Sequence, residues 1–431
     1  MNTTEQNKKD EMRALNDIAA GVAGAFKWMD NTETAKVLEE YKQEMLQYLT
    51  QKDSASENPM KRASQEHWYS LYLEKKRLEA HRIQVHYDQY KHVSNRPGEK
   101  PVTLFNNRPD GKYALTSARQ TTLFQKKYIR NHAVIGQTGK TCEMDYYILH
   151  SRSKEGLYIC PGCGAEQTLD QLLDGCDYCN AKFDVSAYDA KVISVSEIDN
   201  IFKSRETTSN QTAAIIQAVI LTLIGLPAIL FGSLLVPVTL GLSLIIAAAG
   251  GVALYFVYRI IVNNYKNTFE PVFRMREHNP GFSTEEFIGS LDSKLKAIHY
   301  ASDPQELGAF VKCDITPCLK NYQNIIDCET GQICYKKFSI KDDYQYIELH
   351  REIRVLNDCG NNIKAGRGIV KVVLAKKLSH KLKNDVALYR CSTCGSSISL
   401  VEGGKCKYCG NEMDYAAYDW VVVHYRHVRS L

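Results

Sequence analysis

The chain has 431 residues, a net charge of +5 at pH 7 and a mean hydropathy of −0.33. This length allows two or three domains, and the mild charge permits contact with anionic lipid or nucleic acid without demanding it. A count of 14 cysteines would fit a secreted disulfide scaffold, but the opening residues contain no apolar run of the kind that a signal peptide needs. We therefore expect thiols in a reducing, cytosol-like compartment.

The first 95 residues, 1–95, are expected to be a helical region. Apolar residues recur at intervals of three and four over 15–29 and again over 37–49, which is the spacing of amphipathic helices. A third helix is predicted over 67–90, behind a polar linker rich in Ser, Lys and Asn. Packing against one another and against the rest of the chain is the simplest role for these helices.

A strand-rich unit is predicted at 100–200 and contains the first of two four-cysteine motifs, within 158–183. Cys160 and Cys163 form one C-x-x-C pair, and a second pair follows after 12 intervening residues. One tight turn lets a C-x-x-C pair present both thiolates to the same ion, and zinc takes four such ligands in a tetrahedron. The motif therefore predicts a zinc ribbon with its ligands at Cys160, Cys163, Cys176 and Cys179.

The segment 207–258 contains no Asp, Glu, Lys or Arg. A bilayer core about 30 Å thick is crossed by about 20 helical residues, so this length favours two crossings over one. Gly, Ser and Pro residues within 232–237 provide a turn between helices predicted at 212–232 and 238–261. Basic residues flank this hairpin, 207–262, and its connector has none, so we expect a multi-pass protein of the cell membrane with both termini cytoplasmic. A buried hairpin of a soluble core is the alternative interpretation.

Residues 282–431 form the C-terminal unit, which carries the second four-cysteine motif. Two helices are predicted first, with capping boxes that begin at Ser283 and Asp303, and three or more strands follow. Helices followed by an antiparallel sheet are an α+β order. The second ribbon is predicted over 389–413, with its ligands at Cys391, Cys394, Cys406 and Cys409.

The two ribbons predict two structural zinc ions. A site with four cysteines leaves no open position for water or substrate, so its usual role is to stabilise a fold. A redox C-x-x-C needs only one pair beside a βαβ unit, whereas these pairs come in fours. Nucleic-acid binding needs a basic, aromatic-rich face, and the acidic balance of the two motifs argues against it. Their charged residues are Lys182, Lys405 and Lys407 against Glu166, Asp170, Asp174, Asp177, Glu402 and Glu412.

The similarity between the two units extends beyond the cysteines. Segment 183–195 matches 413–425, with an Asp, an Ala, a Tyr, a second Asp and a Val at equivalent positions. Two further pairs of segments resemble each other and are predicted to be strands joined by a Gly-containing turn. These pairs are 124–136 with 347–360, and 142–152 with 369–380. We therefore expect an internal repeat of strand, strand, ribbon and strand, used once on each side of the uncharged segment.

The C-terminal unit resembles a known family. The order F-x-x-E-x-F, A-S-D-P-Q-E-L and D-I-T-P-x-L, followed by strands and a closing W-V-V-V-H-Y, is similar to the mitochondrial inner membrane translocase subunit 44-like domain. The resemblance covers 282–431 and implies the fold of nuclear transport factor 2, a curved sheet wrapped by helices around a cone-shaped cavity. Bacterial members often sit behind a membrane segment, and the mitochondrial relatives dock on lipid during protein import. The family pattern contains no ribbon.

An enzyme that uses this C-terminal cavity is an alternative. Asp342, Asp343, Glu348, His350 and Glu352 are the titratable residues nearest the sheet, and alternation along a strand places the last three on one face. A solvated sheet face explains the same pattern. Five cysteines lack knuckle spacing and are expected to be small buried residues. They are Cys313, Cys318, Cys328, Cys334 and Cys359.

The predicted architecture is an α+β multidomain membrane protein. It comprises N-terminal helices, two four-cysteine zinc ribbons in duplicated strand-rich units, a two-helix transmembrane hairpin and a cone-like C-terminal domain. The predicted function is a non-enzymatic, zinc-stabilised adaptor or binding platform in protein or lipid transport, with membrane lipid and a protein as partners. The alternatives are an enzyme and a nucleic-acid-binding ribbon protein.

Overall fold

The computed structural model describes the chain in several stretches. They are 31–51, 60–92, 103–106, 113–151, 190–198, 270–279, 284–378 and 414–429, with shorter pieces within 157–180, 223–259 and 389–412 and at residue 282. The helix predicted over 15–29 lies outside the described residues.

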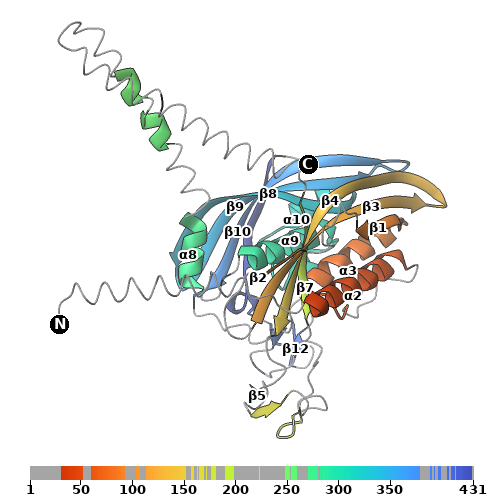
Figure 1. Cartoon of the computed structure of the whole chain (residues 1–431), viewed down its shortest axis with the longest axis horizontal. Coiled ribbons are helices and arrows are strands. Elements are labelled where there is room, and N and C mark those ends of the chain that lie inside the picture. Colours follow the sequence, from red (N-terminus) through yellow and green to blue (C-terminus); the bar gives the residue numbers. More distant parts are fainter. Residues whose placement is uncertain are drawn as a thin grey trace.

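The first half of the chain folds into two helices and an antiparallel sheet (Figure 1). The helices are α2 (Asn31–Thr50) and α3 (Gln65–Ala80). The strands are β1 (Gln84–His92), β2 (Thr103–Asn106), β3 (Tyr113–Arg130), β4 (Ala133–Ser151) and β7 (Lys191–Ile198). They pair in the order β1-β3-β4-β7, with β2 on the same edge of β3 as β1.

The second half repeats this arrangement. Its helices are α8 (Glu270–His278), α9 (Thr284–Tyr300), the 3-10 helix η4 (Pro304–Leu307) and α10 (Thr316–Tyr322). Its strands are β8 (Ile325–Lys341), β9 (Tyr344–Asp358), β10 (Ile363–Lys377) and β13 (Val421–Arg429). They form an antiparallel sheet in the order β8-β9-β10-β13, which is the order of β1, β3, β4 and β7 in the first sheet.

The two halves also share an unusual backbone link between a helix start and the last strand. Ala63, just before α3, forms a parallel bridge with Val192 of β7, and Val311, before α10, forms one with Val422 of β13. The following amides donate to the same two strand carbonyls, over 2.9 Å from Ser64 and 2.8 Å from Lys312. This repeated detail makes α2, α3 and the first sheet the structural counterparts of α9, α10 and the second sheet.

Local patterns explain the ends of the helices. In α2 the apolar positions at 37–49 are buried, as predicted for an amphipathic helix. The predicted third helix, however, is a helix only to Ala80, because Arg82 adopts a left-handed φ of 54° and the chain continues as strand β1. Asp303 forms the predicted capping box with Glu306, but the helix it opens is the short η4, which is followed by a separate helix, α10.

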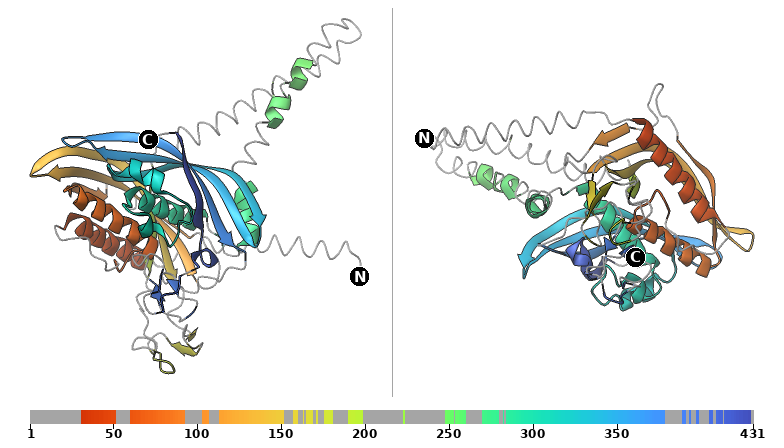
Figure 2. Two further views of the ribbon diagram at one scale, coloured as in Figure 1. Left: turned by 180° about the vertical axis from the view of Figure 1, so that it is seen from behind. Right: turned by 90° about the horizontal axis from the view of Figure 1, so that it is seen from below.

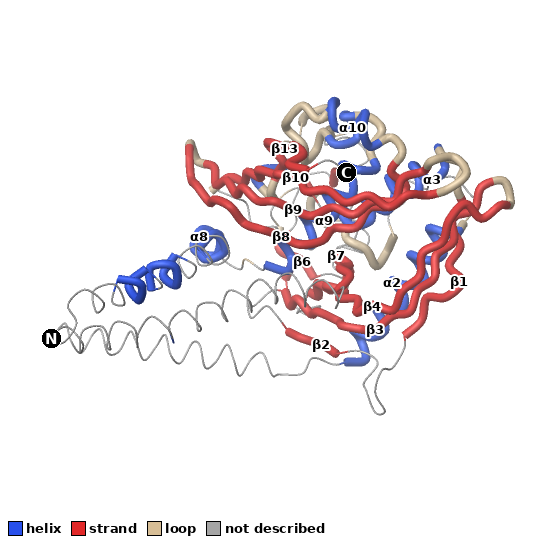
Figure 3. The backbone as a smooth tube through the Cα atoms, turned by 90° about the horizontal axis from the view of Figure 1, so that it is seen from above, coloured by secondary structure: helices blue, strands red, loops and turns tan. Residues whose placement is uncertain are grey.

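One hydrophobic core joins the two halves. It contains buried residues from α2, α3, β7, α9 and the second sheet. Figure 3 shows α9 between the two sheets, near β7 at the edge of the first sheet. The contact of α9 with β7 is close, since a Cβ on Gly289 would lie 2.3 Å from Ser194 Oγ. A helix of the second half is thus packed directly on the sheet of the first.

The two sheets also meet at their β3–β4 and β9–β10 turns, which lie at the same side of the molecule (Figure 1). His81 Nδ1 lies 2.7 Å from the Asp358 carboxylate, and Arg130 forms an ion pair with the same carboxylate. A Cβ on Gly136 would lie 2.2 Å from Ile363, so this backbone approach requires a residue without a side chain. The β9–β10 turn lies where the sequence comparison predicted it, but the β3–β4 turn is at Asn131 and His132, and the Gly-containing turn predicted at 136–140 is part of strand β4.

The described part of the chain contains no helix long and apolar enough to cross a membrane. Of the predicted hairpin at 207–262, the structure describes only residues 223, 248–252 and 254–259, and the rest of the hairpin lies outside the described residues. The predicted transmembrane hairpin is therefore contradicted, and so is the localisation as a multi-pass membrane protein. The absence of charged residues from 207–258 is a property of composition, and it does not by itself specify a continuous helix.

The predicted fold class is corrected accordingly. The described residues form a strand-rich fold of two antiparallel sheets with helices packed on them, and not an α+β membrane architecture. The predicted domain boundaries stay predictions.

Candidate metal centre and the cavity between the sheets

Each four-cysteine motif begins with a short antiparallel hairpin. Strand β5 (Leu157–Ile159) pairs with β6 (Glu166–Thr168), and β11 (Tyr389–Arg390) pairs with β12 (Ser397–Ile398). The first C-x-x-C of each motif therefore falls between the two strands of its hairpin. In Figures 1 and 2 both hairpins lie at the same end of the molecule, beyond the sheets.

The second C-x-x-C of each motif forms the same tight turn. The amide of Asn180 donates to the carbonyl of Cys176 over 2.8 Å, and the amide of Gly410 donates to the carbonyl of Cys406 over 2.7 Å. Both donors have positive φ, 54° at Asn180 and 74° at Gly410. Asn and Gly are the residues that adopt this left-handed conformation most readily, so the sequence specifies the turn locally.

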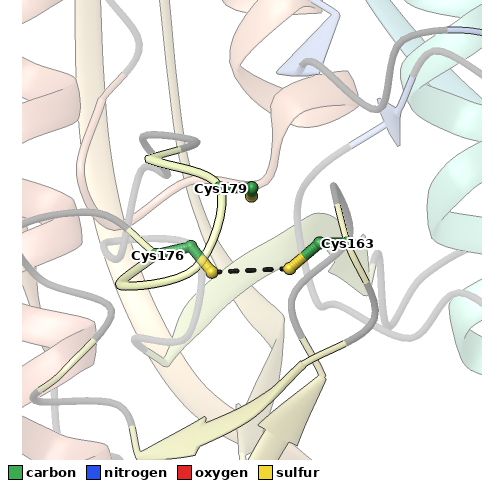
Figure 4. A group of neighbouring side chains, drawn as sticks. All are labelled: Cys163, Cys176 and Cys179. Atoms are coloured by element: carbon green, nitrogen blue, oxygen red, sulfur yellow. Dashed lines mark hydrogen bonds between the residues drawn. The ribbon is translucent and has the colours of Figure 1, made fainter.

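The thiols of the first motif converge. The Sγ atoms of Cys163, Cys176 and Cys179 all lie within 4.8 Å of one another, and Cys163 Sγ lies 3.6 Å from Cys176 Sγ (Figure 4). Four thiolates at about 2.3 Å from a tetrahedral zinc ion are about 3.8 Å apart. The three cysteines are thus placed to hold one metal ion; the predicted fourth ligand, Cys160, lies outside the described residues.

The second motif is described in part. Cys406 is buried, 2% exposed, and lies near Cys409 at the other end of the same turn, while the predicted ligands Cys391 and Cys394 lie outside the described residues. The side-chain amide of Asn411 donates to Thr393 Oγ1 over 2.7 Å, which ties this turn to the segment between the other two cysteines. In the first motif, Gln167 of β6 donates to Asp177 over 2.7 Å.

The titratable residues considered for catalysis are dispersed among separate interactions. Asp342 and Asp343 occupy the β8–β9 turn, with φ of 50° and 63°. Glu348 forms an ion pair with Lys371 over 2.6 Å. Glu352 instead contacts two arginines, Arg354 over 3.0 Å and Arg367 over 2.7 Å. Burial and the nearby Lys336 lower the pKa of His350.

The five cysteines without knuckle spacing also differ in environment. Only Cys328 of the five is buried, whereas Cys359 is exposed and the other three are intermediate. The expectation that all five are buried is therefore wrong for Cys359.

A feature that the sequence did not predict is a cavity of about 780 Å³ between the two halves. Its wall includes Lys126 of β3, whose Nζ lies 2.8 Å from the Asp327 carboxylate of β8 and 3.7 Å from the Glu74 carboxylate of α3. Tyr128 donates to the same Asp327 oxygen. The three ionisable residues are 52 to 253 positions apart in the chain, and so no local motif connects them.

Burial and charge act differently on these two carboxyl groups. Burial raises the pKa of Glu74, and Lys126 opposes this only in part. Burial would also raise the pKa of Asp327, but its contacts with Lys126 and Tyr128 outweigh burial and lower the pKa. The pKa values of the two neighbouring carboxyl groups are therefore shifted in opposite directions, that of Glu74 upward and that of Asp327 downward.

Comparison with known proteins found no matching family, curated protein or solved structure. The resemblance of 282–431 to the translocase subunit 44-like domain therefore stays a prediction.

Proposed function

We propose that the protein is a non-enzymatic adaptor whose two ribbons, each stabilised by one zinc ion, form a binding end for a protein partner. The proposed ligands are Cys160, Cys163, Cys176 and Cys179 for one ion, and Cys391, Cys394, Cys406 and Cys409 for the other. The converging thiols of the first motif and the repeated turn in the second support this assignment.

The observation that carries the proposal is the exposure of Tyr178. This side chain lies between Cys176 and Cys179 and is 74% exposed. A tyrosine offers a large contact area and loses little conformational entropy on binding, so it is a common anchor in protein interfaces. A metal-bound turn would hold this anchor in one orientation before the partner arrives, which reduces the entropy cost of association.

The chemistry of the ribbons supports binding over catalysis. Four thiolates complete the coordination of zinc, so the site offers no position for a reacting water. Over the two motifs together six carboxylates stand against three lysines, although the second motif holds two of each. This balance favours a protein over a nucleic acid as partner.

Elemental analysis tests the metal. The purified full-length chain is expected to contain about two zinc ions, since each site of four cysteines holds one. Cys176→Ser should reduce the content to about one, because it removes a ligand with its thiolate. Cys359→Ser is the matched control, an exposed cysteine outside the motifs, and should leave the content unchanged. A content near zero, or iron in place of zinc, contradicts the metal assignment.

Site-specific photocrosslinking tests the binding end. A photoreactive residue at position 178 is expected to give one discrete adduct in the cells that make the protein, and the adduct should disappear with Cys176→Ser. Phe273 on α8, 58% exposed and away from the ribbons, is the control position. An identical adduct from positions 178 and 273, or none from position 178, would refute the binding end. An adduct with nucleic acid would favour the nucleic-acid-binding alternative.

A further inference from the structure

The cavity between the two halves has a composition suited to a small amphipathic ligand. Its volume of about 780 Å³ lies within the about 300–1,000 Å³ range of small-molecule sites. Residues of α2, α3, β1, β3, β4 and β7 line it from the first half, and residues of α9, β8, β9 and β10 line it from the second. This cavity therefore differs from the cone-shaped cavity predicted for the C-terminal unit, which the C-terminal sheet alone would enclose.

One part of the wall is aromatic. Tyr41, Tyr87, Tyr90 and Phe124 line the cavity together with two methionines. The hydroxyl of Tyr41 lies 2.7 Å from His67 Nε2, and that of Tyr90 lies 2.8 Å from the hydroxyl of a tyrosine on β4. Because these hydroxyls are bonded within the protein, the tyrosines offer mainly their rings to a ligand. Flat rings and flexible thioethers suit an apolar body.

The same wall carries more cations than carboxylates. Among the described lining residues, Lys126, Lys296, Arg354 and Arg367 stand against Glu74, Asp327 and Glu329. Three of the four cations form ion pairs, Lys126 with Asp327 and both arginines with Glu352.

Lys296 on α9 is different. Its ammonium has no hydrogen bond or ion pair within 4.0 Å to any residue in the described part of the chain, although it acts at longer range on Glu74 and Asp327. A half-buried ammonium in this setting is a favourable position for an incoming anion, since the anion adds a charge-assisted hydrogen bond.

The spacing along α3 gives the scale of the ligand. His67, beside the tyrosines, and Glu74, beside Lys126, both line the cavity and are seven residues apart. At about 1.5 Å per residue this separation is about 10 Å along the helix axis. Lys296 acts electrostatically on both of these residues, so a ligand of up to that length with its anion at Lys296 can also contact the aromatic wall.

We propose that this cavity binds a small organic anion with an apolar body, an aliphatic or aromatic carboxylate, with its carboxylate at Lys296 and its body against the tyrosines. The proposal does not depend on the ribbons or on their metal. It assigns a ligand class to the junction of the two halves, where residues from both are required.

Isothermal titration calorimetry on the full-length protein tests the proposal with three probes of one chain length. Decanoate is expected to bind with one site per chain, decanol more weakly, and decyltrimethylammonium not measurably. Lys296→Met removes the charge and keeps much of the side-chain length. It should lower the affinity for decanoate by about tenfold or more, because a charge-assisted hydrogen bond is lost. The same variant should leave the affinity for decanol within about twofold, since the apolar contacts remain.

Two further variants make the test specific. Lys320→Met removes an exposed lysine on α10, outside the cavity, and should leave all three affinities unchanged. Val195→Phe adds a ring inside the cavity and should lower the affinity for both decanoate and decanol. Thermal unfolding of each variant shows that it is folded. Equal binding of the cation and the anion, or unchanged decanoate binding in Lys296→Met, would overturn the proposal, as would the absence of decanoate binding.

Discussion

Arg77 of α3 is expected to be one of the most important single residues for stability, because its side chain caps the C-terminal ends of two other helices. Its guanidinium donates to the carbonyl of Tyr300 over 2.9 Å and 3.2 Å, and to that of Ala301 over 2.8 Å. It also donates to the carbonyls of Tyr322, over 2.9 Å, and Gln323. These are the C-terminal ends of α9 and α10, where carbonyls lack helical partners and the helix dipole attracts a cation.

The magnitude follows from the four carbonyls. Arg77 is only 3% exposed, so water cannot easily replace its hydrogen bonds. The Gln323 carbonyl also lies 2.8 Å from His81 Nε2 and keeps that contact. At about 1 kcal/mol for each of the other three carbonyls left without this donor, Arg77→Met should lower the free energy of unfolding by about 3 kcal/mol. Arg77→Lys keeps one nitrogen near part of this set and should cost about half as much.

Urea unfolding followed by circular dichroism and tryptophan fluorescence measures these differences. Lys76→Met is the neighbouring control, because Lys76 pairs with Glu306 but its side chain is 48% exposed, and a surface pair contributes about 0–1 kcal/mol. If Arg77→Met costs less than about 1 kcal/mol, or no more than Lys76→Met, the carbonyls are satisfied in another way and the reasoning fails.

Two further predictions concern packing and pH. Gly289→Ala should destabilise the protein by about 1–3 kcal/mol, because the new Cβ meets the side chain of Ser194, and adding Ser194→Gly should restore much of the loss if this contact is the cause. Burial lowers the pKa of His67 to about 3 and that of His299 to about 4, so both are neutral in the folded state. In the unfolded chain each histidine has a pKa of about 6.5 and takes up a proton below that pH. The contribution of the two histidines to the free energy of unfolding should therefore be complete above pH 6.5. Below it, that free energy should fall by about 1.4 kcal/mol per pH unit for each histidine, until the pKa of the folded state is reached. Urea unfolding between pH 7.5 and 5 measures the slope, which His67→Gln should reduce by about half; a slope unchanged in the variant would contradict the assignment to His67.

The features that the sequence predicted correctly depend on nearby residues. The capping box at Asp303 needs only the next three residues, and the buried face of α2 follows from spacing within one helix. The tight turns after Cys176 and Cys406 depend on an Asn and a Gly a few positions away. Such patterns are complete before the chain folds, so they can be read directly.

The features that the sequence missed depend on contacts across the chain. The helix predicted over 67–90 gives way to β1 because this segment finds a strand partner in β3, some 40 residues later. Lys126 and Asp327 are 201 residues apart, and nothing near either residue indicates that they share a cavity. The membrane prediction used the length and composition of the uncharged segment, whereas the described part of the chain contains no helix long and apolar enough to cross a membrane.

The repeated halves explain where new function can arise in this fold. The backbone links of Val192 and Val422 are equivalent, so each half keeps the same connection between its helix and its last strand. The contacts between the halves are not equivalent, since α9 packs on β7 and Arg77 of the first half caps the helices of the second. Side chains at that junction are free to differ from their counterparts without disturbing either sheet. The cavity and Lys296 lie at this junction, where the two copies of one architecture differ in their surroundings.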